Sequence, residues 1–281
     1  MPGVLPPGLP RFIPQVDTAD LQAFNQALRW PAYAVGLRRI FSPDSHTLTP
    51  VWAAGPARQV LGLADHQSTI LVCSGKDALL EAFWTRRRAD QLIERIAQGS
   101  WDLVLAPDFS MYGNQPRAEH LINFRRNLLI AAEFAAAGLT AVPFLHWLRR
   151  EDIERYLAWV NRQHPQGPPA IAINLQTCRS EREWKDVLPG LALLAASLPA
   201  TLPVLVTGTS RPHRIATLRT FFSDRLYLLS QNALHAARYG GLMTPTGRIS
   251  HRARVQDLFS ANVHLYDDLV NGRITHCPQP R

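Results

Sequence analysis

The sequence predicts an α/β fold, and more narrowly a (β/α)8 barrel of the TIM type. Short apolar runs alternate with longer amphipathic segments along the chain, as parallel βα units require. Several runs end in glycine or in polar residues, which is typical of buried parallel strands that stop at a turn. The 281 residues suffice for one such barrel, which needs roughly 250. The weaker stretches allow an irregular or incomplete barrel, and an open doubly wound parallel sheet is the alternative.

The expected elements follow one another in a regular order. Seven strands are predicted, at residues 32–37, 69–73, 102–107, 140–144, 170–174, 203–208 and 226–229. An eighth would fall between Ser42 and His66, where the pattern is weak. Helices are predicted over 18–28, 77–98, 116–137, 151–162 and 180–198, and from Pro212 onward. Ser180 and Glu183 have the spacing of a capping box, which begins a helix. In the helix 116–137, the side chains expected to face the core are Leu121, Phe124, Leu128 and Phe134.

The two ends of the chain differ from its centre. Residues 1–16 hold five prolines and show no periodicity, which predicts a Pro-rich N-terminal arm. Residues 17–281 are predicted to form a single barrel-like domain that ends in a basic segment, 235–281. The chain carries a formal charge of +8, with clustered arginines that match phosphate geometry. Nucleic acid is therefore an expected partner, and a solvated basic surface is the alternative.

Composition excludes several classes of protein. The hydrophobic content of 46% and the charged content of 19% are ordinary for a globular chain and argue against disorder. No apolar run reaches the roughly 18 residues that a membrane span requires, and no signal-peptide pattern is present. The three cysteines, Cys73, Cys178 and Cys277, are scattered, which suits a reduced cytoplasm. We expect a cytoplasmic protein without membrane contact, metal or cofactor.

One stretch, Pro203 to Gly247, suggests a family. It reads as strand, Gly208, a helix opened by Pro212, a second strand, then Arg238-Tyr-Gly240 and Thr244-Pro-Thr-Gly247. This pattern resembles the last two βα units of the tRNA-guanine (queuine) transglycosylases, which use a TIM barrel to exchange guanine for a 7-deazaguanine. The resemblance implies a shortened and divergent member, since it covers about forty-five residues well, in agreement with the barrel prediction.

The resemblance also implies two losses. In the transglycosylases the last barrel strand ends in a nucleophilic aspartate, and the matching position here is Leu229 or Ser230. Neither residue can attack a ribose in that way, so no covalent ribosyl intermediate is expected. The family also carries a zinc site of three cysteines and a histidine. The tail of this chain offers His276 and Cys277 alone, which cannot close a tetrahedral site.

Polar residues just past the expected strands should line one mouth of the barrel. Asp108 follows an apolar strand and a proline, where a carboxylate is costly without a purpose, so we expect it to act as a general acid or base. A helix N-cap or turn aspartate is the alternative. Asp108-Phe-Ser110 also resembles an early strand end of the transglycosylases that contacts the base. The Pro-Asp-Phe-Ser motif is similar, too, to one in an uncharacterised family found on phages and plasmids.

The remaining candidate residues fall into two groups. Those expected to bind a planar base are Ser110, His146, Asn174, Gln176, Gly208 and Ser230; Gln176 is included because the transglycosylases read the base edge with a glutamine after a strand. A surface amide at Gln176, a simple turn at Gly208 and core packing at His146 are the alternatives. Those expected to bind phosphate are Arg238, Arg248 and Arg252, on the segment that approaches the nucleic-acid backbone in the transglycosylases.

Together these observations predict a transglycosylase-like protein. It would recognise guanine or a 7-deazaguanine, free or attached to tRNA, DNA or a modified protein partner. If it is an enzyme, it is a nucleobase transferase that lacks the nucleophilic aspartate. Reduced proteins of this kind accompany deazaguanine enzymes in some antiphage operons, which suggests a role in defence. The alternative is a subunit that binds a base or nucleic acid without catalysis, in a homodimer or a heterodimer.

Overall fold

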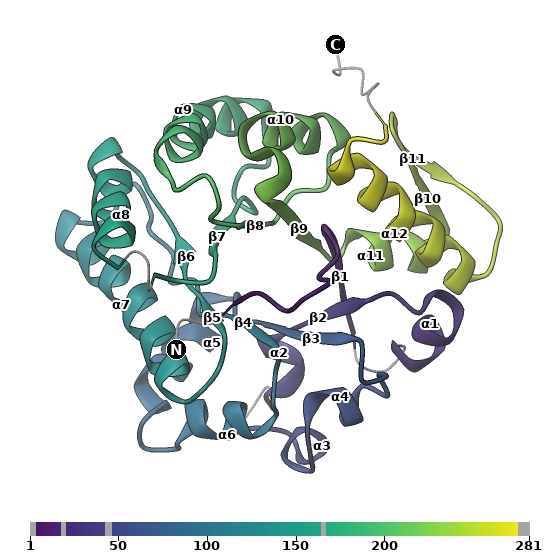
Figure 1. Cartoon of the computed structure of the whole chain (residues 1–281), viewed down its shortest axis with the longest axis horizontal. Coiled ribbons are helices and arrows are strands. Elements are labelled where there is room, and N and C mark those ends of the chain that lie inside the picture. Colours follow the sequence, from purple (N-terminus) through teal and green to yellow (C-terminus); the bar gives the residue numbers. More distant parts are fainter. Residues whose placement is uncertain (1–3, 18–20, 43–46, 164–166, 275–281) are drawn as a thin grey trace.

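The core of the protein is a ring of parallel strands enclosed by helices (Figure 1). The computed structural model describes residues 4–17, 21–42, 47–163 and 167–274. The strands are β1 Phe12–Val16, β2 Ala32–Gly36, β3 Ser68–Val72, β4 Leu103–Leu105, β5 Ala141–Val142, β6 Phe144–Leu145, β7 Ile171–Asn174, β8 Val204–Thr207 and β9 Leu226–Ser230. Their order in the sheet is β5-β4-β3-β2-β1-β9-β8-β7-β6, and every pair in it is parallel.

The ring closes at a proline. Pro143 alone separates β5, which pairs with β4, from β6, which pairs with β7, so the two short strands are halves of one extended segment. Proline has no amide hydrogen to donate, so the ladder is interrupted there, although the Pro143 carbonyl still accepts from the Ala172 amide at 2.9 Å. Eight extended segments therefore complete the circle. The predicted TIM-type barrel is confirmed in an irregular form, and the open doubly wound sheet is excluded.

Helices follow the strands and cover the outside of the ring (Figure 1). They are α1 Leu21–Leu28, α2 Leu37–Ile40, α3 Pro50–Ala53, α4 Ala57–Val60, α5 Asp77–Arg86, α6 Leu92–Gln98, α7 Arg117–Ala136, α8 Arg150–Gln163, α9 Glu181–Ser197, α10 Pro212–Phe222, α11 Asn232–Arg238 and α12 Val255–Asn271. A hairpin of β10 Gly241–Thr244 and β11 Gly247–Ser250 lies between α11 and α12. The predicted capping box is confirmed, since the Glu183 amide donates to Ser180 Oγ at 3.1 Å and the Ser180 amide donates to Glu183 Oε2 at 2.7 Å.

The N-terminal prediction was wrong in part. Residues 12–16 belong to the barrel as β1, which pairs with β9 from Phe12 to Pro14 and with β2 from Gln15 to Val16. This is the eighth strand, and the described residues between Ser42 and His66 form α3, α4 and turns instead. Pro14 concealed the strand, because proline argues against a central strand. It is tolerated at the position where the pairing of β1 passes from one neighbour to the other.

Residues 4–10 close one end of the barrel. The interior is packed with small and branched side chains, including Ala34, Ile70 and Ala172. Leu5 and Leu9 pack against this cluster from the N-terminal side of the strands. Figure 1 shows the dark purple segment crossing the end of the ring that faces the viewer. Among the described residues, the cavities of the barrel lie at the opposite end, at the carboxyl ends of the strands.

The face of α7 toward the core also differs from the prediction. Leu121 is 38% exposed, and Phe124 and Leu128 are half-buried against the core, whereas Phe134 is fully buried as expected. The side chains buried along the first half of the helix are polar: His120, Asn123, Arg126 and Asn127. The spacing of apolar residues gave the wrong buried face, because this helix buries a row of hydrogen-bonding side chains. These side chains bind the backbone of the loop after β4.

Candidate ligand-binding site

A polar layer covers the apolar interior at the carboxyl ends of the strands. Side chains alternate along a strand, so the residue two positions beyond an inward apolar residue faces the same way. Ile13, Val72, Phe144, Ala172, Leu205 and Leu229 face the interior. The residues two positions further on are Gln15, Ser74, His146, Asn174, Thr207 and Gln231, and all of them line cavities at the mouth. The strands thus change from apolar to polar at one common level.

Two adjoining cavities open above this layer. The larger has a volume of about 590 Å³ and is lined by Asp108 and by the predicted base-binding residues Ser110, His146, Asn174 and Gln176. The smaller, of about 270 Å³, is lined by Gly208 and Ser230 and shares Asn174 and Gln176 with the first. The larger cavity lies within the range of small-molecule sites, about 300–1,000 Å³. Every residue predicted to contact a base therefore lies at this mouth.

Asp108 is buried at the wall of the larger cavity. Its residue is 6% exposed, and its Oδ2 accepts a hydrogen bond of 2.8 Å from Asn174 Nδ2. Its Oδ1 is buried and has no hydrogen-bond partner in the described part of the chain. Burial raises the pKa of Asp108, and nearby Asp77 adds to the rise, while His146 and the Asn174 bond oppose it. The helix N-cap alternative is excluded because the N-cap of α7 is Pro116, eight residues after Asp108.

Asn174 joins Asp108 to the loop between β7 and α9. Its Oδ1 accepts from the backbone amide of Gln176 at 3.0 Å. The carboxamide of Asn174 therefore links the Asp108 carboxyl to the backbone at Gln176. Gly208 packs directly beside this arrangement with φ of +78°, where a Cβ would lie 2.2 Å from the Gln176 nitrogen and 2.7 Å from Asn174 Oδ1. Glycine is required here by both the backbone angle and the contact. The space beside Gly208 is thus filled by the protein's own loop.

The loop after β4 is held by the polar row on α7. The Phe109 amide donates to Asn127 Oδ1 at 2.8 Å, and Asn123 Nδ2 donates to the Ser110 carbonyl at 2.9 Å. His120 Nε2 lies 2.8 Å from the carbonyl oxygen of Tyr112. The three side chains follow helical spacing and fix successive backbone groups of the segment that begins at Asp108. This is why α7 buries polar groups at its start.

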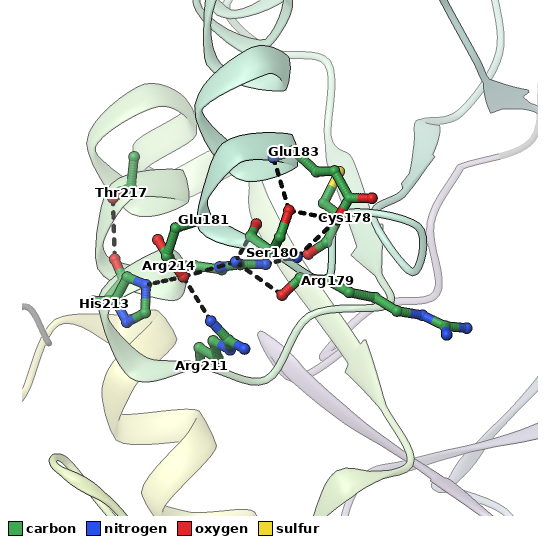
Figure 2. A network of polar contacts seen from close by, with 9 residues as sticks. All are labelled: Cys178, Arg179, Ser180, Glu181, Glu183, Arg211, His213, Arg214 and Thr217. Carbon is green, nitrogen blue, oxygen red and sulfur yellow. Dashed lines mark hydrogen bonds and ion pairs between the residues drawn. The ribbon is translucent and has the colours of Figure 1, made fainter. Parts of the chain in front are cut away.

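A second network fixes the loop between β7 and α9 (Figure 2). Arg214, on α10 and only 3% exposed, donates to the carbonyl of Cys178 and, at 3.0 Å, to that of Ser180. Glu181 accepts from Arg214 at 2.8 Å and from Arg211 at 2.6 Å. The hydrogen bond from Arg214 is the largest cause that lowers the pKa of Glu181. The loop that carries Gln176 is therefore fixed by side-chain hydrogen bonds to its backbone, as is the loop that carries Asp108.

The three arginines predicted to bind phosphate do not line the mouth cavities, although Arg238 pairs with Asp17, which lines the larger one. Arg238 forms an ion pair of 2.6 Å with Asp17, and Arg248 donates to the carbonyl of Tyr239 at 2.7 Å. Arg252 is exposed. None of the three is among the residues that line the two cavities. That grouping came from the resemblance in the C-terminal segment, and the structure does not bring these side chains to Asp108.

Sequence reasoning missed another set of charged residues. The larger cavity is lined by Arg38, Arg39, Lys76 and Arg179, and by the acids Asp17 and Asp77. A signal was available, because Arg38 follows Gly36 at the end of β2 and Lys76 follows Ser74 after β3. Loops after barrel strands carry the functional groups of this fold. These positions were passed over in favour of the denser arginine clusters.

Among the described residues, no group of three or more histidine, cysteine, aspartate or glutamate side chains is placed to hold a metal ion. His276 and Cys277 lie outside the described ranges. Across the same ranges, none of the helices combines the length and the apolar character needed to span a bilayer.

The fold and the site define a (β/α)8-barrel protein with a polar, ligand-sized cavity at the carboxyl ends of its strands. The family model described as "Domain of unknown function (DUF4417)" matches residues 51–208, which is more than half of the chain, and the protein belongs to this family. The match runs from α3 through β8 and includes Asp108, Asn174 and Gly208. No curated protein matches the chain.

Proposed function

We propose that the protein recognises guanine or a 7-deazaguanine at the mouth of its barrel. One observation carries the proposal: a buried carboxyl, with one oxygen that has no partner in the described structure, borders a cavity that is lined by amides and hydroxyls as well as by charged side chains. The N1–H and the exocyclic amine of guanine lie side by side and can donate to one carboxylate. A 7-deazaguanine keeps the same edge. Asp108 would supply the acceptors, and Asn174 and Gln176, which line the same cavity, would contact the rest of the ring.

Asp108 is also suited to move a proton. Because burial raises its pKa, the carboxyl can hold a proton closer to neutrality than a solvent-exposed aspartate does. As general acid or base it would protonate or deprotonate a ring nitrogen while a bond to the base is made or broken. The enzyme, on this proposal, is a transferase acting on a nucleobase carried by nucleic acid or by a modified protein. A cytoplasmic setting and a role in antiphage defence belong to the same proposal.

A second candidate is a base-binding subunit without catalysis, alone or in a dimer. The observation that favours it is the end of β9. Leu229 faces the apolar interior and Ser230 Oγ accepts from the Asn232 amide at 3.1 Å, so neither presents a carboxylate where the transglycosylases have one. A covalent step through this position is therefore excluded from both candidates.

Asp108→Asn separates the two candidates. Calorimetry measures the binding of guanine and of 7-deazaguanines, and incorporation of labelled guanine into tRNA measures exchange. If the wild type exchanges guanine and Asp108→Asn loses exchange by a far larger factor than its affinity for guanine falls, the enzyme is supported, and binding without exchange in the wild type supports the subunit. Asp257→Asn, an exposed aspartate on α12, controls for the change of charge and should leave both readouts unchanged. If neither guanine nor a 7-deazaguanine binds the wild type, the proposal fails.

A further inference from the structure

We infer that the larger mouth cavity also binds a phosphate monoester through Arg38, Lys76 and Arg179, so that its ligand is a nucleotide and not a free base. The inference rests on the proposed function for the base and for the place of the site. The phosphate contact itself stands on separate residues and can be tested apart from the base.

The three cations approach the cavity from different sides of the barrel. Arg38 lies on α2 after β2, Lys76 lies between β3 and α5, and Arg179 lies in the loop between β7 and α9. In the ring, β2 and β3 are neighbours, while β7 is on the opposite side. Cations that are far apart in the sequence and follow strands on opposite sides of the barrel thus line the same cavity. An anion between them would be contacted from both sides.

These cations form no ion pair within the described residues. In the part of the chain that the structure describes, no carboxylate lies within ion-pair distance of Arg38, Lys76 or Arg179. Arg39, next to the first of them, differs because it pairs with Asp17 at 2.6 Å. Figure 2 shows the Arg179 side chain extending away from the network that fixes its own backbone. Its carbonyl is bound by Arg214 at 3.5 Å, so the loop is anchored while the guanidinium stays available.

The acids of the cavity do not cancel this charge. Asp17 is shared between Arg39 and Arg238, each at 2.6 Å. Asp77 already accepts from the Tyr112 hydroxyl at 2.6 Å and from Ser110 Oγ at 3.3 Å. Among the lining residues four cations face three acids. The surplus of charge in the cavity is therefore positive.

A nucleotide matches this division of the cavity. Its phosphate monoester carries a charge of about −1.5 to −2 and three strong acceptor oxygens, which guanidinium groups bind in a forked geometry. The volume of about 590 Å³ is within the range of sites for ligands of that size. The base would contact Asp108 and Asn174, and the phosphate would lie among the cations. This site differs from the one predicted at Arg238, Arg248 and Arg252.

The test compares guanosine 5′-monophosphate with guanosine, by calorimetry at fixed ionic strength. The phosphate should improve affinity by about tenfold or more, as charge-assisted hydrogen bonds do. Arg179→Ala and Arg38→Ala should each remove most of that advantage and leave the affinity for guanosine unchanged. Arg252→Ala, which removes the same charge from an exposed site outside the cavity, should keep it. The replaced side chains are exposed, and circular dichroism and melting temperature confirm that each variant folds.

Each outcome decides the matter. Equal affinity for the nucleotide and the nucleoside overturns the phosphate site and leaves the guanine proposal standing. Loss of the advantage in Arg252→Ala alone moves the phosphate to the C-terminal segment and also overturns the inference. If adenosine 5′-monophosphate binds as tightly as the guanine nucleotide, the phosphate site holds and the guanine proposal fails. Absence of binding by every compound overturns both.

Discussion

Replacing Asp108 with asparagine should stabilise the folded protein, and more so as pH rises. Asp108 is 6% exposed and one of its oxygens has no partner in the described structure, so its charged form is poorly solvated. Burial raises its folded-state pKa above the unfolded value of about 3.9. The folded state therefore binds the proton more tightly than the unfolded chain. The stability that this group contributes is fully present below the unfolded pKa and is lost as pH rises through the folded pKa.

The size of the effect follows from the pKa. Asp108→Asn keeps the shape of the side chain, and its amide oxygen can accept from Asn174 Nδ2 as the carboxyl oxygen does at 2.8 Å. The substitution removes the titration. Relative to the wild type, its free energy of unfolding should increase with pH by about 1.4 kcal/mol for each unit by which the pKa is raised. The difference should level off above the folded pKa, and at low pH the two proteins should agree within about 1 kcal/mol.

Urea unfolding from about pH 4 to pH 9 measures this difference, because groups common to both proteins cancel in the subtraction. Asp257→Asn provides a control of opposite sign. Asp257 is exposed and pairs with Arg254 at 2.9 Å, and this hydrogen bond lowers its pKa. The stability that Asp257 contributes is present above its unfolded pKa and is lost as pH falls through its folded pKa. Asp257→Asn should therefore be less stable than the wild type at neutral pH, and this difference in stability should disappear on acidification. A difference for Asp108→Asn that is independent of pH, or that turns negative, would refute the reasoning.

Two further substitutions test the loops that hold the site. Gly208→Ala should lower the free energy of unfolding by about 1–3 kcal/mol more than Gly138→Ala does. Both glycines have positive φ, but of the two only Gly208 has other atoms in the way of a new Cβ, which would lie 2.2 Å from the Gln176 nitrogen. Denaturant unfolding measures both, and equal losses would show that the contact is relaxed easily. Arg214→Lys should cost about 2–4 kcal/mol, since the buried guanidinium donates to the carbonyls of Cys178 and Ser180 and to Glu181. Arg211→Lys, half-exposed on the same glutamate, should stay within about 0.5 kcal/mol. Arg214→Lys should also speed up amide hydrogen exchange in the loop between β7 and α9. Unchanged exchange in this variant would contradict the role of Arg214 in holding that loop.

The barrel could be predicted because its strands carry a local signal. All seven predicted strands are present, since a buried parallel strand needs a continuous apolar run and each run is visible on its own. The strand β1 was missed because Pro14 argues against a central strand in any local reading. Its place depends on a change of pairing partner, which involves β2 and β9 and so cannot be seen in residues 12–16 alone.

The sequence predicted which polar residues lie at the mouth of the barrel, but not which cations line the same cavity. Asp108, Asn174 and Gln176 were found because the barrel places strand-terminal residues at one mouth, whatever their exact partners. Lys76 and Arg179 were not found, because an exposed cation in a loop looks the same in sequence whether it faces a cavity or open solvent. The polar row on α7 was missed for a related reason. His120, Asn123 and Asn127 bind backbone atoms of another loop, and backbone partners leave no trace in the side-chain pattern.

The position of the family match bears on which part of the chain defines the function. The matched residues 51–208 include Asp77, Asp108 and Arg179, and they end after β8, so that β9 and the C-terminal segment 235–281 lie outside the match. The candidate site is thus built mainly from the part that defines the family, while the three predicted phosphate-binding arginines lie outside it. An account of function should therefore begin from the cavity and its charges. The C-terminal segment can differ without disturbing Asp108, whose supports on α7 and β7 are within the matched region.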